Sequence, residues 1–85
     1  MKYKVFISRT FKKKFYQLQK SMQNLIRKTL KELEKDPYSS RPNCDIKLLR
    51  DTKPKKRRLR VSNYRFIYAV EDKEIKIIDL LKREA

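Results

Sequence analysis

The sequence predicts an α+β domain in which a helical hairpin packs on one face of a twisted, mainly antiparallel sheet of about four strands, in the order β-α-α-β-β-β. Three observations predict it. The chain has 85 residues, which suits one domain spanning residues 1–85. Apolar residues alternate with polar ones near the N-terminus and again in the C-terminal half, and between these regions they recur at helical spacing. Helices grouped between strands favour this layered class.

The first elements are a strand and a short helix. Apolar and polar residues alternate over Tyr3–Ile7, which predicts a strand with one buried face. Ser8 or Thr10 can then cap a helix. The apolar positions of that helix are Phe11, Phe15 and Leu18.

A second, longer helix is expected after a short turn. Ser21 is its expected N-cap, and Asp36-Pro37 ends it because the residue before a proline avoids helical backbone angles. Its apolar stripe consists of Met22, Leu25, Ile26, Thr29, Leu30 and Leu33. Since the connection is short, the two helices should form an antiparallel hairpin.

The C-terminal half predicts the remaining strands. A short strand is expected around Ile46–Leu48, followed by a half-buried strand over Arg58–Val61. Two longer strands follow over Tyr64–Val70 and Ile75–Leu81. Ser62-Asn63 predicts a tight turn in which Asn63 takes the left-handed conformation.

Two registers are possible for the last two strands. If Glu71 pairs with Glu74, Asp79 falls on the face of the aromatic residues Phe66 and Tyr68. With one more loop residue, Val70 pairs with Lys76, Ile67 with Asp79 and Arg65 with Leu81. We favour the second register, because an unpaired buried carboxylate is costly.

Charge is the strongest compositional signal. The chain has 25 Lys and Arg against 10 Asp and Glu, a formal net charge of +15. No acidic residue precedes Glu32, and Asp51 is the only one between Ile46 and Val70. A generic lysine-rich surface would not leave such long stretches without acids. The expected partner is therefore a polyanion, either RNA, DNA or a strongly acidic protein.

Several classes of function are excluded by composition. The chain has no His and no Gly and only one Cys, Cys44, so imidazole catalysis, a glycine-rich phosphate loop and an internal disulfide are all excluded. Its acids are scattered singly, and we expect neither a metal nor a cofactor. The longest apolar run, Phe66–Val70, is far too short to span a membrane, and we expect no secretory signal because the N-terminal residues contain no apolar block long enough for one. We therefore expect a cytoplasmic protein.

The remaining candidate chemistry is cationic. Lys53–Arg60 carries most of it, and this tract could be a solvated loop or a localisation-like signal. Strand alternation begins at Arg58, however, so Arg58 and Arg60 should project together from the face opposite the core. Arg65, and Arg83 if the last strand continues, should lie on the same open face. Arginines fixed on a sheet can bind phosphate in a bidentate manner.

This pattern resembles the RelE/ParE toxin superfamily, and most closely its RelE branch. The matching segments are Lys47-Leu48, Arg58–Val70 and Ile75–Leu80 followed by Lys82-Arg83. The family pattern is a basic-hydrophobic-basic strand, a turn, Tyr-Arg-hydrophobic-hydrophobic-Tyr, a hydrophobic strand and a closing basic pair. The resemblance covers essentially the whole chain, and its central block is the most specific part.

The resemblance implies a ribosome-dependent mRNA endonuclease that uses a 2′-hydroxyl to attack the neighbouring phosphate without a metal. Arg65 matches the arginine that holds the scissile phosphate. Arg83 matches the one that stabilises the transition state or the leaving group, and Arg60 completes the expected catalytic set. The residues expected to bind RNA or the ribosome are Lys47, Lys53, Lys55, Lys56, Arg57, Arg58 and Lys82.

The resemblance also implies a partner, an acidic RelB-like antitoxin that forms a heterodimer or heterotetramer with the toxin. In the favoured register, Ile67, Ala69 and Ile77 form an apolar strip on the open face, where this antitoxin should bind. Two other functions stay open. One is a ParE-type poison of DNA gyrase, and the other is a non-enzymatic basic module that binds RNA or the ribosome.

Overall fold

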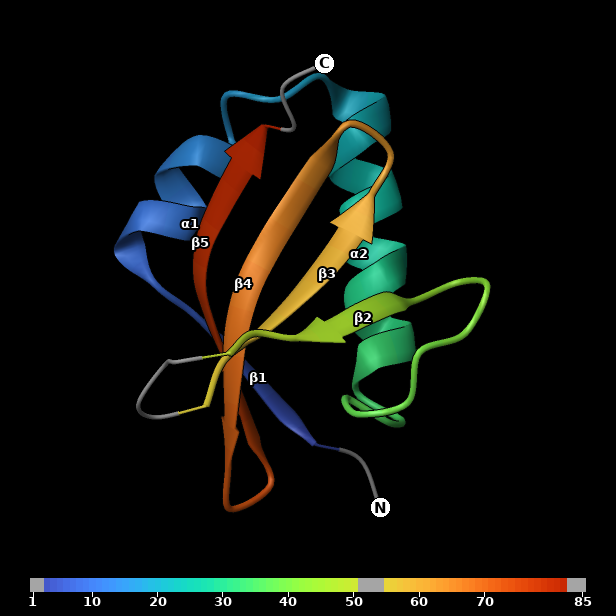
Figure 1. The fold of residues 1–85 in the computed structure, drawn as a ribbon. Coiled ribbons are helices and arrows are strands. Elements are labelled where there is room, and N and C mark those ends of the chain that lie inside the picture. The colour runs from blue at the N-terminus through green and yellow to red at the C-terminus, as the bar shows by residue number, and fades with distance from the viewer. Residues whose placement is uncertain (1–2, 51–54, 83–85) are drawn as a thin grey trace.

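The fold is a five-stranded sheet with two helices on one face (Figure 1). The computed structural model describes residues 3–50 and 55–82. Its elements are β1 (Lys4–Ile7), α1 (Arg9–Phe15), α2 (Lys20–Leu33), β2 (Asp45–Leu48), β3 (Arg57–Val61), β4 (Tyr64–Glu71) and β5 (Glu74–Lys82). The strand order is β1-β5-β4-β3-β2, antiparallel throughout except for the parallel pair β1 and β5. The predicted class is confirmed, with five strands where about four were expected.

The helices begin and end for different local reasons. At α1 the predicted cap is confirmed at Ser8, whose Oγ accepts a hydrogen bond from Phe11 N at 3.0 Å. The prediction that Ser21 caps α2 is wrong, because the helix begins at Lys20 and Gln19 is its N-cap. After α2 the guanidinium of Arg41 donates to the carbonyl of Glu32 at 2.7 Å. This bond satisfies one of the carbonyls that a helix end leaves without a partner.

The core lies between the helices and one face of the sheet. Its buried apolar side chains come from both helices, from all strands except β1, and from Cys44 just before β2: Phe11, Phe15, Ile26, Leu33, Cys44, Ile46, Leu59, Val61, Phe66, Tyr68, Ile75, Ile77 and Leu80. The hydroxyl of Tyr68 donates to the carbonyl of Pro37 at 2.7 Å, so this polar group is satisfied inside the core. Burial raises the pKa of Tyr68, which is therefore a neutral structural residue.

The hairpin turns form without glycine. Ser62 has a φ of 54°, and Asp72 and Lys73 have φ values of 46° and 69°. The prediction that Asn63 is the left-handed residue is wrong, since that conformation falls on Ser62 instead. A positive φ at the first central residue alone is typical of a type II′ turn, and positive values at both are typical of type I′. Each non-glycine residue in this region carries some backbone strain.

The β4–β5 register combines the two alternatives. Glu71 pairs with Glu74 across a two-residue turn, so the pairing of Val70 with Lys76 is wrong; Val70 pairs with Ile75. The register then shifts between Ile67 and Tyr68, and beyond this bulge Ile67 pairs with Asp79 and Arg65 with Leu81, as predicted. A bulge adds one residue to one strand and so restores the alternation on its far side. The sheet thereby avoids placing Asp79 among the aromatic residues.

Asp79 is instead held by α1. Its Oδ1 lies 2.8 Å from the Nζ of Lys14 and also accepts a hydrogen bond from Leu80 N at 2.8 Å. The hydrogen bond from Lys14 is the main reason that the pKa of Asp79 is lowered. This ion pair joins α1 to the part of β5 that follows the bulge.

Candidate nucleic-acid interface on the open sheet face

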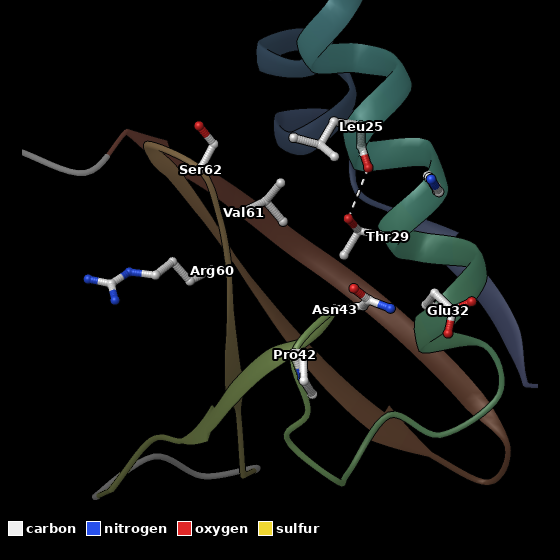
Figure 2. A pocket seen from close by; sticks show the side chains of 9 residues that line it. Leu25, Thr29, Glu32, Pro42, Asn43, Arg60, Val61 and Ser62 are labelled. Atoms are coloured by element: carbon white, nitrogen blue, oxygen red, sulfur yellow. Dashed lines mark hydrogen bonds between the residues drawn. The ribbon is translucent and has the colours of Figure 1, made fainter.

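The candidate interface is built on β3, whose side chains alternate between the core and the open face of the sheet. Leu59 and Val61 point to the core and are 0% and 6% exposed. Arg58 and Arg60 lie on the opposite face, which the helices leave open. Figure 2 shows the contrast at the end of the strand, where Val61 points toward α2 and Arg60 points away from it. The predicted division of β3 is confirmed.

Neighbouring strands bring two more cations to this face. Lys47 on β2 pairs with Arg58, and Arg65 on β4 pairs with Arg60. Residues directly opposite each other in an antiparallel pair share a face, with Cβ atoms about 4.5–5.5 Å apart. The four side chains line an open hollow of about 340 Å³. Three strands thus present one cluster, which we call the cationic hollow: Lys47, Arg58, Arg60 and Arg65.

The electrostatics of the cationic hollow favour an anionic ligand. Within the described ranges, Asp45 is the one acid that forms an ion pair with it, at 3.8 Å between its Oδ2 and the Nη1 of Arg60. Like charges placed directly opposite each other, as in Arg60 and Arg65, destabilise a sheet. A bound phosphate would remove this repulsion, and planar guanidinium groups can bind its oxygens in pairs.

Asp45 was not among the predicted site residues. It lies two positions before Lys47 on β2 and opposite Arg60, so the alternation that placed the other residues also places Asp45 on the open face.

The other predicted basic residues are not all near the cationic hollow. Arg83 and Lys53 lie outside the described residues, and their roles stay predictions. Lys55 is exposed and Lys56 half-buried, just before β3. Lys82 pairs with Tyr64 and lines a different hollow, beside Lys14 of α1 and Gln17 just after that helix.

Arg57 is placed differently from the expectation of a loop residue. It is the first residue of β3 and pairs with Tyr68, whose side chain is in the core. Its guanidinium carbon lies 4.6 Å from the ring centre of Tyr38. Arg57 is therefore on the helix side of the sheet, opposite the cationic hollow.

The apolar strip predicted for the antitoxin is only partly on the open face. Ile67 lies there, half-buried, between Arg58 and Asp79. The placement of Ile77 is wrong, because the two-residue turn pairs it with Tyr68 in the core, and it is 1% exposed. Ala69 is only 4% exposed, because its short methyl group is covered by its neighbours. It therefore adds no accessible apolar surface to the open face.

Neither a membrane span nor a metal-ligand cluster emerges from the described residues. No helix in residues 3–50 and 55–82 is both long and apolar enough to cross a bilayer. Over the same ranges, no three side chains of His, Cys, Asp or Glu gather where they could bind a metal ion.

Comparison with known proteins places the chain in a family. The sequence model of a family described as the ParE toxin of the type II toxin-antitoxin system, parDE, matches residues 5–85. No curated protein matches the sequence significantly. Among solved structures, the archaeal RelE-RelB complex from Pyrococcus horikoshii OT3 contains a chain that is 32% identical, with a TM-score of 0.85. That match covers 98% of this chain and 97% of the other.

Two more distant structures share the fold. A chain of the toxin-antitoxin complex RelBE2 from Mycobacterium tuberculosis is 19% identical with a TM-score of 0.82, covering 98% of this chain and 100% of the other. The isolated E. coli RelE toxin is 22% identical with a TM-score of 0.67, covering 98% and 86%. The family match over nearly the whole chain, together with the archaeal structure, establishes that the chain belongs to the RelE/ParE superfamily of toxins of type II toxin–antitoxin systems and is most like RelE.

Proposed function

We propose that the chain is a ribosome-dependent mRNA endonuclease that cleaves the message in the ribosomal A site and so inhibits translation. The observation that carries this proposal is the cationic hollow, where Lys47, Arg58, Arg60 and Arg65 converge on the open face. Ordered cations from three strands suit the binding of a phosphate that must be held still while it reacts. The likeness to RelE chains supports the same reading.

The proposed chemistry needs only the RNA and fixed cations. The 2′-oxygen forms a bond to the adjacent phosphorus while the bond from phosphorus to the 5′-oxygen breaks. The 2′-hydroxyl loses its proton and the leaving oxygen gains one. Arg65 and Arg60 would hold the non-bridging oxygens and neutralise the charge that grows on them, and Arg83 is proposed to act on the leaving group. Preorganised donors of this kind stabilise a transition state more than a ground state.

Binding to the ribosome would extend beyond the cut site. Lys47 and Arg58 lie at the edge of the cationic hollow nearest β2, where they can contact RNA phosphates. The basic residues before β3, and Lys82 at the end of β5, would add contacts with ribosomal RNA. Such contacts make affinity strongly dependent on salt. A chain with this activity works where ribosomes are, so we propose that it is cytoplasmic.

A RelB-like antitoxin is the proposed protein partner. RelE chains similar to this one are found in complexes with RelB. With a net charge of +15, the chain should attract an acidic segment that folds on contact, and Ile67 gives that segment an apolar contact on the open face.

Poisoning of DNA gyrase is the second candidate. The observation that favours it is the description of the matching family, which is that of the ParE toxin. The cationic hollow argues for RNA cleavage instead, since inhibition of gyrase by binding does not require a clamp on a phosphate.

A translation assay with primer extension separates these functions. The purified chain is added to programmed ribosomes, and the ends of the message are mapped, with DNA breaks scored in parallel in a gyrase reaction. Cleavage within codons that requires ribosomes supports the endonuclease. Accumulated DNA breaks with intact mRNA would replace it with the gyrase poison, and neither outcome would indicate a module that only binds RNA or the ribosome.

A further inference from the structure

The helix side of β3 carries a second cationic feature. Arg57 projects there, and its guanidinium carbon lies 4.6 Å from the ring centre of Tyr38. A guanidinium over an aromatic ring at this distance is held by a cation–π interaction. Because Arg57 and Arg58 are adjacent on a strand, their side chains lie on opposite faces of the sheet. The Arg57–Tyr38 stack is therefore separate from the cationic hollow.

The stack is held in place by its surroundings. The carboxylate of Asp36 accepts hydrogen bonds from the backbone N–H groups of Tyr38 and Ser39 at 2.9 and 3.2 Å, which fixes the loop that carries the ring. The ring of Tyr3 packs edge-on against Tyr38, with centres 6.2 Å apart and planes at 79°. Despite these contacts, Tyr38 is 47% exposed.

Other exposed or stacked rings lack this combination. Arg27 lies over Phe15, but Phe15 is 5% exposed and belongs to the core. Tyr16 is 58% exposed, and within the described part of the chain no cation stacks on it. Only Tyr38 joins an accessible ring to a stacked cation in that part. Arg57 also has no ion pair to a carboxylate there, and Lys55 is exposed two residues earlier.

We propose that the Arg57–Tyr38 stack binds an unpaired base of single-stranded RNA, with Lys55 contacting an adjacent phosphate. Bases stack on tyrosine rings and on guanidinium planes, and proteins that bind single strands combine such platforms with nearby cations. The inference rests on the proposed function only for the choice of RNA as the ligand. It adds a base-binding contact on the face of the sheet opposite the proposed cut site.

Equilibrium binding of two labelled RNA strands tests this proposal. One is a 2′-O-methyl oligonucleotide, which the proposed chemistry cannot cleave, and the other is the same strand with its central nucleotides made abasic. Wild-type protein should bind the intact strand roughly tenfold more tightly, as expected for one stacked base. Tyr38→Leu should abolish that preference by weakening binding to the intact strand alone, whereas Tyr38→Trp should keep it. Tyr16→Leu is the matched control and should behave as wild type.

Arg57→Lys separates stacking from charge. It keeps the charge but loses the planar group, so it should reduce the preference for the intact strand and leave binding to the abasic strand nearly unchanged. Melting temperatures confirm that each variant is folded. Equal affinity of the wild type for both strands, or a preference that survives in folded Tyr38→Leu, would overturn the proposal. Since neither strand can be cleaved, a failure here is distinct from a failure of the endonuclease assay.

Discussion

The two faces of β3 differ in burial and charge over Arg58–Val61. Leu59 and Val61 meet the helices in the core, whereas Arg58 and Arg60 line the cationic hollow with side chains from β2 and β4. One strand therefore stabilises the fold with one face and carries part of the proposed ligand site on the other. Substitutions on the core face should lower stability, and those on the open face should lower activity without unfolding the chain.

The largest expected loss of stability is on the core face. Leu59→Ala should lower the free energy of unfolding by about 2–5 kcal/mol, because it leaves a cavity where a side chain is fully buried. Urea unfolding measures the effect. The control is Leu48→Ala on neighbouring β2, where the leucine is 45% exposed and the change should stay within about 0.5 kcal/mol. Equal losses for both variants would contradict the assignment of Leu59 to the core and Leu48 to the surface.

A second test concerns the apolar residue on the open face. Ile67→Asp should speed dissociation of the antitoxin roughly tenfold while changing association little, since burial of contacts governs off-rates. Surface plasmon resonance with the antitoxin that copurifies with the chain measures both rates, and Ile67→Val serves as the conservative control. An unchanged off-rate, with unchanged hydrogen exchange over Tyr64–Val70, would remove Ile67 from the antitoxin interface.

The smallest effect concerns the ion pair beyond the bulge. Lys14 lowers the pKa of Asp79 below its ordinary value of 3.8, so the charged form favours the folded state. That stabilisation is fully present above the unfolded pKa and is lost as the pH falls through the lowered one. Asp79→Asn should therefore cost roughly 0.5–1 kcal/mol at pH 7, a difference that shrinks in acid.

Thermal melting of Asp79→Asn and of the wild type, measured from pH 7 down into strong acid, gives the difference in stability between them. Glu71→Gln, which removes an exposed pair with Lys76, is the control and should change stability by only a few tenths of a kcal/mol. A destabilisation by Asp79→Asn that stays constant down to strong acid would show that the charge of Asp79 is not its source.

The sequence predicted the order of elements because the apolar periods are clean, but it could not resolve the β4–β5 register. The favoured pairing holds beyond the bulge, at Arg65 and Leu81, and the rejected one holds at the turn, at Glu71 and Glu74. A single uniform register was assumed, and a bulge lets both exist in one hairpin. The wrong placement of Ile77 on the open face follows directly from that assumption. Ile77 lies on the turn side of the bulge, where its side chain faces the core.

Other differences depend on contacts between distant segments. Arg57 belongs to a basic tract that could be read as a loop, and its stack on Tyr38 depends on how the segment after α2 folds back toward β3. Asp45 lies next to Arg60 because β2 and β3 pair in this register. The alternation of side chains along the strands, by contrast, already predicted that Arg58, Arg60 and Arg65 share one face. Local periodicity thus predicted which face a strand residue occupies, and the tertiary structure determined its neighbours.

The central claim is that the open face holds the reacting phosphate, and cleavage by Arg65→Ala tests it most directly. The measurement is the single-turnover rate of mRNA cleavage at saturating ribosomes, so that weaker docking does not limit the rate. Removing one preorganised donor should lower the rate roughly 10²–10³-fold with an unchanged melting temperature. Lys13→Ala, which removes an exposed charge from α1 on the helix side, should cleave like the wild type. Near-wild-type cleavage by folded Arg65→Ala would contradict the account.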